Sequence, residues 1–175
     1  MSDKIQSIRN LIREIPDFPK EGILFYDITP ILGNAKALAA SSDLLAEPYK
    51  DRGITQVVGM ESRGFIFAVP VAERLGAGFV PVRKPGKLPA QTLSEEYALE
   101  YGTDRLEMHR DALGDDDKVL VVDDLLATGG TAEATVRMVQ STGAQVVGVA
   151  FVIELGFLNG KDKLGGRPFY SMLQF

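Results

Sequence analysis

Short runs of consecutive apolar residues, separated by segments with helical periodicity, constrain the fold of this 175-residue chain more than any other feature. The runs TQVVG, VLVV and VVGVAFVI are apolar on successive residues, which is typical of parallel strands covered by helices on both faces. We therefore predict an α/β fold with a doubly wound, mostly parallel sheet. The predicted strands are residues 55–59, 78–83, 118–122 and 145–153, and the predicted helices are residues 35–49, 64–75 and 131–142.

The beginning of the chain has apolar side chains at the spacing of one helical face, at Ile5, Ile8, Leu11, Ile12 and Ile15. We predict a helix that packs on the body of the protein, because its polar face is mixed rather than basic. No uninterrupted apolar run approaches the roughly 18–20 residues of a membrane span, and nothing here resembles a signal peptide. We expect no membrane segment and a cytoplasmic location.

Composition excludes several classes of chemistry. The chain has no cysteine, which excludes disulfides, thiolate zinc sites and cysteine nucleophiles. Its one histidine, His109, lies in MHRD, and the sequence has no nucleophile elbow, so a Ser-His-Asp triad is disfavoured. A net charge of −5 argues against a nucleic-acid partner, so any anion site must be local. The length is typical of one domain, over residues 1–175.

The loops that follow the strands are the candidate sites, because ligands of doubly wound sheets bind beyond the carboxyl ends of the strands. The loop MESRG opens a helix, where free backbone N–H groups and the charge of Arg63 suit a phosphate, although a plain connecting turn fits equally well. The segment RKPGK concentrates Arg83, Lys84 and Lys87 directly after a predicted strand. This position favours an anion site over a solvated run of charge.

The stretch VLVVDDLLATGGT, at residues 119–131, is the most informative of these loops. We predict that the strand carries Asp123 and Asp124 to the ligand edge of the sheet. The small residues that follow let the backbone curl around an anion at the next helix N-terminus. This phosphate loop consists of Ala127, Thr128, Gly129, Gly130 and Thr131. Carboxylates beside an anion require ribose hydroxyls and Mg²⁺ between them, so the implied ligand is a phosphorylated sugar.

Three competing motifs are not supported. The string GxxxxGK[ST] of a P-loop does not occur in the sequence. The turn Gly76-Ala77-Gly78 lies between a predicted helix and the following strand, whereas a dinucleotide fingerprint lies between a strand and a helix. Phosphoryl-transfer enzymes with a nucleophilic aspartate favour the spacing Asp-x-Asp, because residues two apart share one side of an extended chain. Asp123 and Asp124 are adjacent instead, which disfavours this chemistry.

The stretch at residues 119–131 resembles the phosphoribosyl-pyrophosphate (PRPP) binding motif of the type I phosphoribosyltransferases. The resemblance covers nearly the whole chain, since FPKEGILFYDITPIL, ESRGF, VRKPGKLP, YALEYG and PFYSMLQF follow in that family's order. The segments outside the PRPP motif resemble the adenine-using members. The chain departs from some relatives at Glu61, where they have aspartate, and at Tyr26, where they have a basic residue.

This resemblance implies transfer of the 5-phosphoribosyl group from PRPP to N9 of adenine, with Mg²⁺ as cofactor and AMP and pyrophosphate as products. It assigns the ribose hydroxyls to Asp123 and Asp124, with a water-mediated contact to Mg²⁺, and the 5′-phosphate to the phosphate loop. Pyrophosphate is assigned to Arg63, to Lys87 and to the backbone of residues 61–63, in which Glu61 and Ser62 are joined by a non-proline cis peptide. The remaining PRPP-binding residues implied are Lys84 and Tyr101.

Two further segments acquire roles from the resemblance. Residues 1–34 correspond to an N-terminal hood that recognises adenine, together with Leu24, Phe25, Tyr26 and Leu125. For Leu24 and Phe25, ordinary core packing is the alternative. Alternating residues at 95–110 predict a β-hairpin that closes near residues 102–104, and residues 84–112 resemble the family's mobile lid. The resemblance makes Glu100 the catalytic carboxylate, and Arg63 assists catalysis.

Two alternative functions, and the oligomeric state, remain open at this point. A transferase for hypoxanthine, guanine or xanthine would keep the PRPP motif, and a non-catalytic PRPP-binding regulator would need an added DNA-binding module. Residues 65–71 are apolar almost all round a predicted helix, which needs only one apolar stripe to cover a sheet. We therefore expect a homodimer formed through this helix, the alternative being that the hood covers it.

Overall fold

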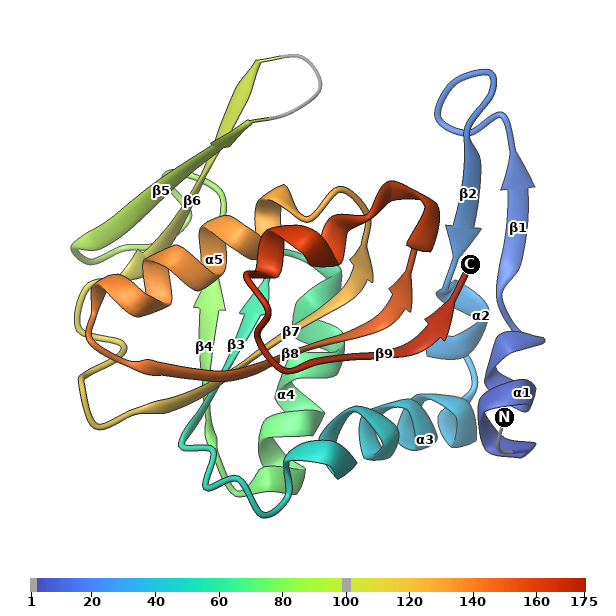
Figure 1. Ribbon diagram of the computed structural model, residues 1–175. Helices are drawn as coiled ribbons and strands as arrows, with labels where there is room; N and C mark the ends of the chain where they lie inside the picture. The colour runs from blue at the N-terminus through green and yellow to red at the C-terminus, as the bar shows by residue number, and fades with distance from the viewer. Residues whose placement is uncertain (1–2, 99–101) are drawn as a thin grey trace.

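The computed structural model describes residues 3–98 and 102–175, and its helices and strands alternate around one central sheet (Figure 1). The helices are α1 Asp3–Arg9, α2 Thr29–Leu32, α3 Ala35–Ala46, α4 Arg63–Leu75 and α5 Gly130–Ser141, with 3₁₀ turns η1 Glu47–Tyr49, η2 Gly156–Leu158 and η3 Gly160–Leu164. The strands are β1 Arg13–Pro16, β2 Leu24–Asp27, β3 Gln56–Met60, β4 Gly78–Val82, β5 Thr92–Ala98, β6 Thr103–His109, β7 Lys118–Leu126, β8 Gln145–Glu154 and β9 Phe169–Gln174.

The central sheet has the order β4-β3-β7-β8-β9, and every neighbouring pair in it is parallel. This confirms the predicted α/β class and all four predicted strands. Strand β9 at the sheet's edge was not predicted. Its polar, partly exposed residues, such as Ser171 and Gln174, distinguish it from the continuous apolar runs that indicate the central strands.

Helices cover both faces of the sheet, and successive strand residues point to opposite faces. Val57 and Leu120 belong to the core on the side of α3 and α4, whereas Val58 and Val121 belong to the core on the side of α5. All four side chains are completely buried. The continuous apolar runs of the sequence therefore serve two separate cores.

The predicted N-terminal helix is too long, because α1 ends at Arg9 and Ile15 lies in strand β1. Strand β1 pairs antiparallel with β2, and Ile15 lies opposite Phe25. Pro16 disfavours helical backbone at Ile15, so the chain extends there despite its helical spacing. Likewise α3 ends at Ala46 and continues as a 3₁₀ turn around Pro48, which cannot donate a backbone hydrogen bond.

The predicted β-hairpin is formed by β5 and β6, which pair antiparallel from Thr92↔His109 to Ala98↔Thr103. Thr103 and Asp104 therefore lie in strand β6 and not in the turn, which corrects the predicted closing position. Backbone hydrogen bonds between Arg83, directly after β4, and Glu107 of β6 join the hairpin to the central sheet. In Figure 1 this hairpin and the β1–β2 hairpin rise at opposite ends of the sheet.

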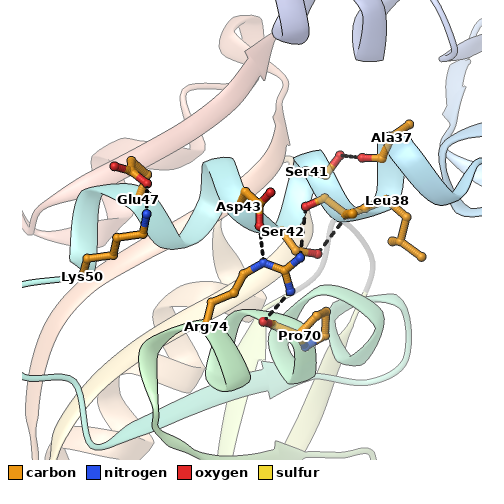
Figure 2. A network of polar contacts seen from close by, with 10 residues as sticks. Ala37, Leu38, Ser41, Ser42, Asp43, Glu47, Lys50, Pro70 and Arg74 are labelled. Atoms are coloured by element: carbon orange, nitrogen blue, oxygen red, sulfur yellow. Dashed lines mark hydrogen bonds and ion pairs between the residues drawn. The ribbon is translucent and has the colours of Figure 1, made fainter.

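Helix α4, which begins at Arg63, is fixed to α3 by Arg74. The guanidinium group of Arg74 pairs with Asp43 of α3 and donates to the carbonyl of Pro70, 2.9 Å away (Figure 2). A second nitrogen donates to the carbonyl of Ala39 at 3.2 Å. These contacts lie at the C-terminal end of α4, far along the helix from Arg63.

Within the described part of the chain, no helix has the length and hydropathy that crossing a bilayer requires.

Candidate active site

The carboxyl ends of β3, β4 and β7 meet at one edge of the sheet, where a cavity of about 280 Å³ opens. Predicted site residues from separate segments line this strand-end cavity: Glu61, Ser62, Arg63, Lys84, Asp123, Asp124, Leu125 and Thr131. Tyr97 and Leu106 of the hairpin complete its wall. The fold thus brings together three loops that are separated by 20 to 60 positions in the sequence.

The phosphate loop encloses a smaller hollow of about 100 Å³ beside this cavity. Gly129 has a φ of 81°, in the left-handed region that glycine adopts without steric cost, and it directly precedes α5. Helix α5 begins at Gly130, one residue before the prediction. The first N–H groups of a helix have no partner within the helix, so those of α5 are suited to an anion at this position.

Asp123 and Asp124 lie within β7, whereas the sequence predicted a strand that ends at Val122. Pairing with β3 ends at Val122, but pairing with β8 continues to Leu126, which keeps the backbone extended. Both carboxylates line the strand-end cavity. Oδ1 of Asp123 accepts the backbone N–H of Asp124 at 2.9 Å.

The electrostatics of this pair are unusual for surface carboxylates. Burial, and secondarily the neighbouring charge of Asp124, raises the pKa of Asp123 well above its ordinary value. Burial also raises the pKa of Asp124, although Arg63 opposes this shift. Nε of Arg63 lies 2.8 Å from Oδ2 of Asp124, whose side chain is 7% exposed. Raised pKa values of two neighbouring carboxylates at a cavity mark this pair as a candidate functional site.

Gly64 is a site residue that the sequence reasoning did not single out. A Cβ atom at this position would lie 2.5 Å from Oδ1 of Asp123, so only glycine lets the first turn of α4 approach that carboxylate. The available signal was its place in the ESRG motif, directly after Arg63.

The carboxylate of Glu61 is engaged in hydrogen bonds within the protein. Arg83 donates to both oxygens, at 3.1 and 3.2 Å, and the backbone N–H of Lys84 donates to one of them at 3.0 Å. The hydrogen bonds from Arg83 lower the pKa of Glu61. The peptide bond between Glu61 and Ser62 is cis, which confirms the prediction made for it. What this segment can offer a ligand is therefore its backbone.

Lys84 reaches the strand-end cavity, whereas Lys87 does not line it. Nζ of Lys84 donates to the hydroxyl of Tyr97 at 2.9 Å and pairs with Asp104 on the neighbouring strand of the hairpin. Lys87 is exposed, and its carbonyl accepts from Arg83 at 3.1 Å. Sequence reasoning did not assign Tyr97 or Asp104 to the site. Their facing positions in the hairpin are a signal that requires the register to be known.

The predicted adenine residues are divided among different surroundings. Leu125 lines the strand-end cavity. The ring of Phe25 faces the Arg63 guanidinium carbon at 5.7 Å, whereas Tyr26 contacts Phe175 with ring centroids 4.3 Å apart. Leu24 is 43% exposed, so it is not a core residue. Adjacent residues of a strand point to opposite sides, which explains this separation.

Two predicted residues, Glu100 and Tyr101, lie outside the described residues.

A further hollow of about 520 Å³ lies between α1 and α3, over Ile8, Leu11, Ala37 and Ala40. Its charged residues, Asp3, Lys4 and Lys36, belong to α1 and α3, away from the carboxyl ends of the strands. The strand-end cavity is therefore the better candidate.

Comparison with known proteins gives one family throughout. The sequence pattern of the phosphoribosyl transferase domain matches residues 27–166. The chain is 55% identical over 176 residues to adenine phosphoribosyltransferase of Yersinia pseudotuberculosis, covering 99% of this chain and 94% of the relative.

Solved structures agree with the sequence relatives. The crystal structure of adenine phosphoribosyltransferase from Thermoanaerobacter pseudethanolicus superposes with a TM-score of 0.94 and 53% identity, covering 98% of this chain and 99% of that one. The enzyme of the same name from Saccharomyces cerevisiae, complexed with an imino-altritol bisphosphate and adenine, gives a TM-score of 0.93 and 39% identity, covering 99% and 100%. The chain belongs to the phosphoribosyl transferase family, among relatives named adenine phosphoribosyltransferase.

Proposed function

We propose that this protein transfers the 5-phosphoribosyl group of PRPP to N9 of adenine and releases AMP and pyrophosphate. The observation that carries the proposal is that three features meet at one edge of the sheet. They are the phosphate loop, the carboxylates of Asp123 and Asp124, and the loop of residues 61–63 with the charged side chain of Arg63. These three features correspond to the 5′-phosphate, the ribose hydroxyls and the pyrophosphate of a single PRPP molecule. The bisphosphate and adenine in the Saccharomyces cerevisiae relative support the same pair of substrates.

In this reaction the bond from C1′ to the pyrophosphate oxygen breaks and the bond from C1′ to N9 forms, while the N9 proton of the base is released to water. Positive charge develops on the ribose as pyrophosphate leaves. Arg63 and Lys84 stabilise the negative charge on the leaving oxygens, and Asp123 and Asp124 hold the ribose hydroxyls so that C1′ faces the base. Catalysis by these residues is mainly positioning and charge.

The β5–β6 hairpin is proposed as the lid of this site. Tyr97 and Leu106 already form part of the cavity wall, and Arg137 of α5 holds the hairpin through Glu95 with an Nε to Oε1 distance of 2.6 Å. A closed lid excludes water that would hydrolyse PRPP. Glu100, which lies between β5 and β6 in the sequence, is proposed to act on a ring nitrogen of the purine.

Mg²⁺ is the proposed cofactor, and the carboxylates of Asp123 and Asp124 fit it. Among the described residues no group of three or more potential protein ligands is suited to a metal ion, so the substrate must supply most of the coordination. Two adjacent carboxylates supply hard oxygen atoms that can hold waters of the ion. Bound Mg²⁺ would neutralise charge on the pyrophosphate oxygens.

Selectivity for adenine is proposed to come from the hood. Strand β2 pairs on one side with β1, and over the described residues its other edge has no strand partner. Backbone groups at this edge can read the 6-amino donor and the neighbouring ring acceptor. A 6-oxo purine leaves such groups unpaired, at a cost of about 1–3 kcal/mol for each buried group.

The test is AMP formation from adenine and PRPP with Mg²⁺. We expect hypoxanthine and guanine to be at least about 100-fold poorer substrates in kcat/KM, because buried hydrogen bonds go unmade. Xanthine belongs in the same comparison. Comparable turnover of hypoxanthine would assign the chain to the other purine transferases, and PRPP binding without any turnover would indicate a regulator.

We also propose that two copies form a homodimer through α4. Gly64, Phe67, Ala68, Val71 and Ala72 bury one stripe of this helix, while Ile66 and Val69 remain 38% and 42% exposed. The hood therefore leaves Ile66 and Val69 uncovered. A second copy would cover them and would support the helix that begins at Arg63.

A further inference from the structure

The backbone of η3 lies directly against the phosphate loop. A Cβ atom on Gly160 would lie 2.2 Å from the carbonyl oxygen of Ala127 and 3.0 Å from the amide nitrogen of Gly129. Conversely, a Cβ atom on Gly129 would lie 2.3 Å from the carbonyl oxygen of Gly160. The two backbones therefore meet across a space that admits no side chain on either of them.

Space, rather than backbone conformation, is what requires glycine at position 160. Gly160 is not among the residues with positive φ, although its neighbour Asn159 has a φ of 53°. Alanine could adopt the backbone conformation of Gly160 and is excluded only by Ala127 and Gly129. Position 160 thus offers a substitution that displaces the phosphate loop without forcing an unfavourable dihedral angle.

The segment behind Gly160 is fixed to the body of the protein. The backbone N–H of Leu155 donates to Leu126 at 2.9 Å, and that of Gly156 donates to Phe175 at 2.8 Å. Leu164, at the end of η3, is 2% exposed and belongs to the core beneath α5. Because both ends are fixed, η3 forms a rigid wall that cannot simply move aside.

The opposite side of the phosphate loop faces the hairpin and is looser. A Cβ atom on Gly130 would lie 3.4 Å from the carbonyl oxygen of Ala98 and 3.5 Å from Cδ2 of Tyr97, which is close to ordinary contact. The phosphate loop is therefore closely packed against η3 and more loosely packed against the hairpin. Of the two, the contact with Gly160 determines where the loop backbone lies.

We infer that Gly160 is a positioning residue for 5′-phosphate binding, acting through Ala127 and Gly129 without touching the ligand. This inference rests on the proposed function, which assigns the phosphate of PRPP and AMP to this loop. An alanine methyl group must push the loop back by about 1 Å to reach ordinary contact. A displacement of that size can cost about 10²-fold where geometry is tightly held.

The experiment compares Gly160→Ala with Gly114→Ala, a matched control whose Cβ atom would have no neighbour within 4 Å. Calorimetry would measure binding of AMP and, separately, of pyrophosphate with Mg²⁺, and steady-state kinetics would measure KM for PRPP. We expect Gly160→Ala to weaken AMP binding and raise KM for PRPP by roughly 10- to 100-fold. Pyrophosphate affinity and kcat at saturating PRPP should change less than about threefold, as in the control.

Unchanged AMP affinity in folded Gly160→Ala would overturn the inference, and so would equal weakening of AMP and pyrophosphate, since that indicates general damage. If Gly160→Ala does not fold, Leu164→Val decides, because it removes one methylene from the anchor of η3. Weaker AMP binding with normal pyrophosphate binding supports the inference, and any other pattern refutes it. A parent protein that binds no AMP contradicts the proposed function itself.

Discussion

Nε of Arg63 lies 2.8 Å from Oδ2 of Asp124, and this ion pair joins the first turn of α4 to the far end of β7. The carboxylate is buried, whereas the Arg63 side chain is 41% exposed. The residue predicted to hold pyrophosphate and a residue predicted to hold ribose are therefore in contact before any ligand is considered.

Replacing Asp124 with Asn should weaken use of PRPP more than it weakens the fold. Loss of one hydrogen bond to a charged group costs about 1.5–3 kcal/mol, so KM for PRPP should rise by roughly 10- to 150-fold. Arg63 remains solvated and the pKa of Asp124 is itself raised, so the free energy of unfolding should change by about 1 kcal/mol or less in either direction. Steady-state kinetics and chemical denaturation measure the two quantities. Asp116→Asn, at an exposed position, is the control, and an unchanged KM in Asp124→Asn would remove this carboxylate from the site.

Asp123→Asn should stabilise the ligand-free protein at neutral pH while impairing PRPP use. The folded-state pKa of Asp123 is raised, so ionisation destabilises the fold when the pH lies above that raised value. Asparagine removes this cost and can still accept the N–H of Asp124. The gain in Tm should shrink as pH falls through the raised pKa and vanish below the ordinary aspartate pKa of 3.8. Thermal melts from pH 8 downwards provide the measurement, and a pH-independent difference would contradict it.

Glu100→Ala should lower kcat by roughly 10- to 10⁴-fold with little change in PRPP affinity, because a group acting on the base contributes to chemistry rather than to sugar-phosphate binding. Glu96→Ala is the matched control, since Glu96 lies exposed on the same hairpin. Rapid-quench measurement of the chemical step, alongside PRPP binding, separates the two effects. If both variants turn over like the parent, Glu100 has no part in the mechanism.

A negative charge on the exposed face of α4 should dissociate the homodimer. Ile66→Glu and Val69→Glu are the appropriate variants, because Phe67, although part of the apolar run, is completely buried within the chain and its substitution would unfold the protein. Sedimentation at micromolar concentration should give about twice the 19.0 kDa chain mass for the parent and a smaller mass for the variants. Phe157→Glu places the same charge on a residue that is 67% exposed elsewhere and should leave the mass unchanged. A monomeric parent with full activity would refute the dimer.

Much of the site was accessible from sequence because its determinants are local. The phosphate loop depends on glycine at Gly129 and on its place between a strand and a helix, both of which can be read from neighbouring residues. The arrangement of Lys84, Tyr97 and Asp104 could not be read in this way, since it depends on the register of a hairpin docked beside β4.

The sequence by itself determined the α/β class, the central strands and the family, because apolar periodicity and a compact motif hold their information within a few residues. Only the tertiary structure decided that Ile15 pairs with Phe25, that β7 runs through Asp123 and Asp124, and that Gly160 closes on the phosphate loop. Each of these depends on a partner distant in sequence. Ile15 is opposite Phe25 and β7 is held extended by β8, while Gly160 is confined by Ala127. Pairing and close packing between distant segments override local preference, because the contacts that stabilise them exist only once the chain has folded.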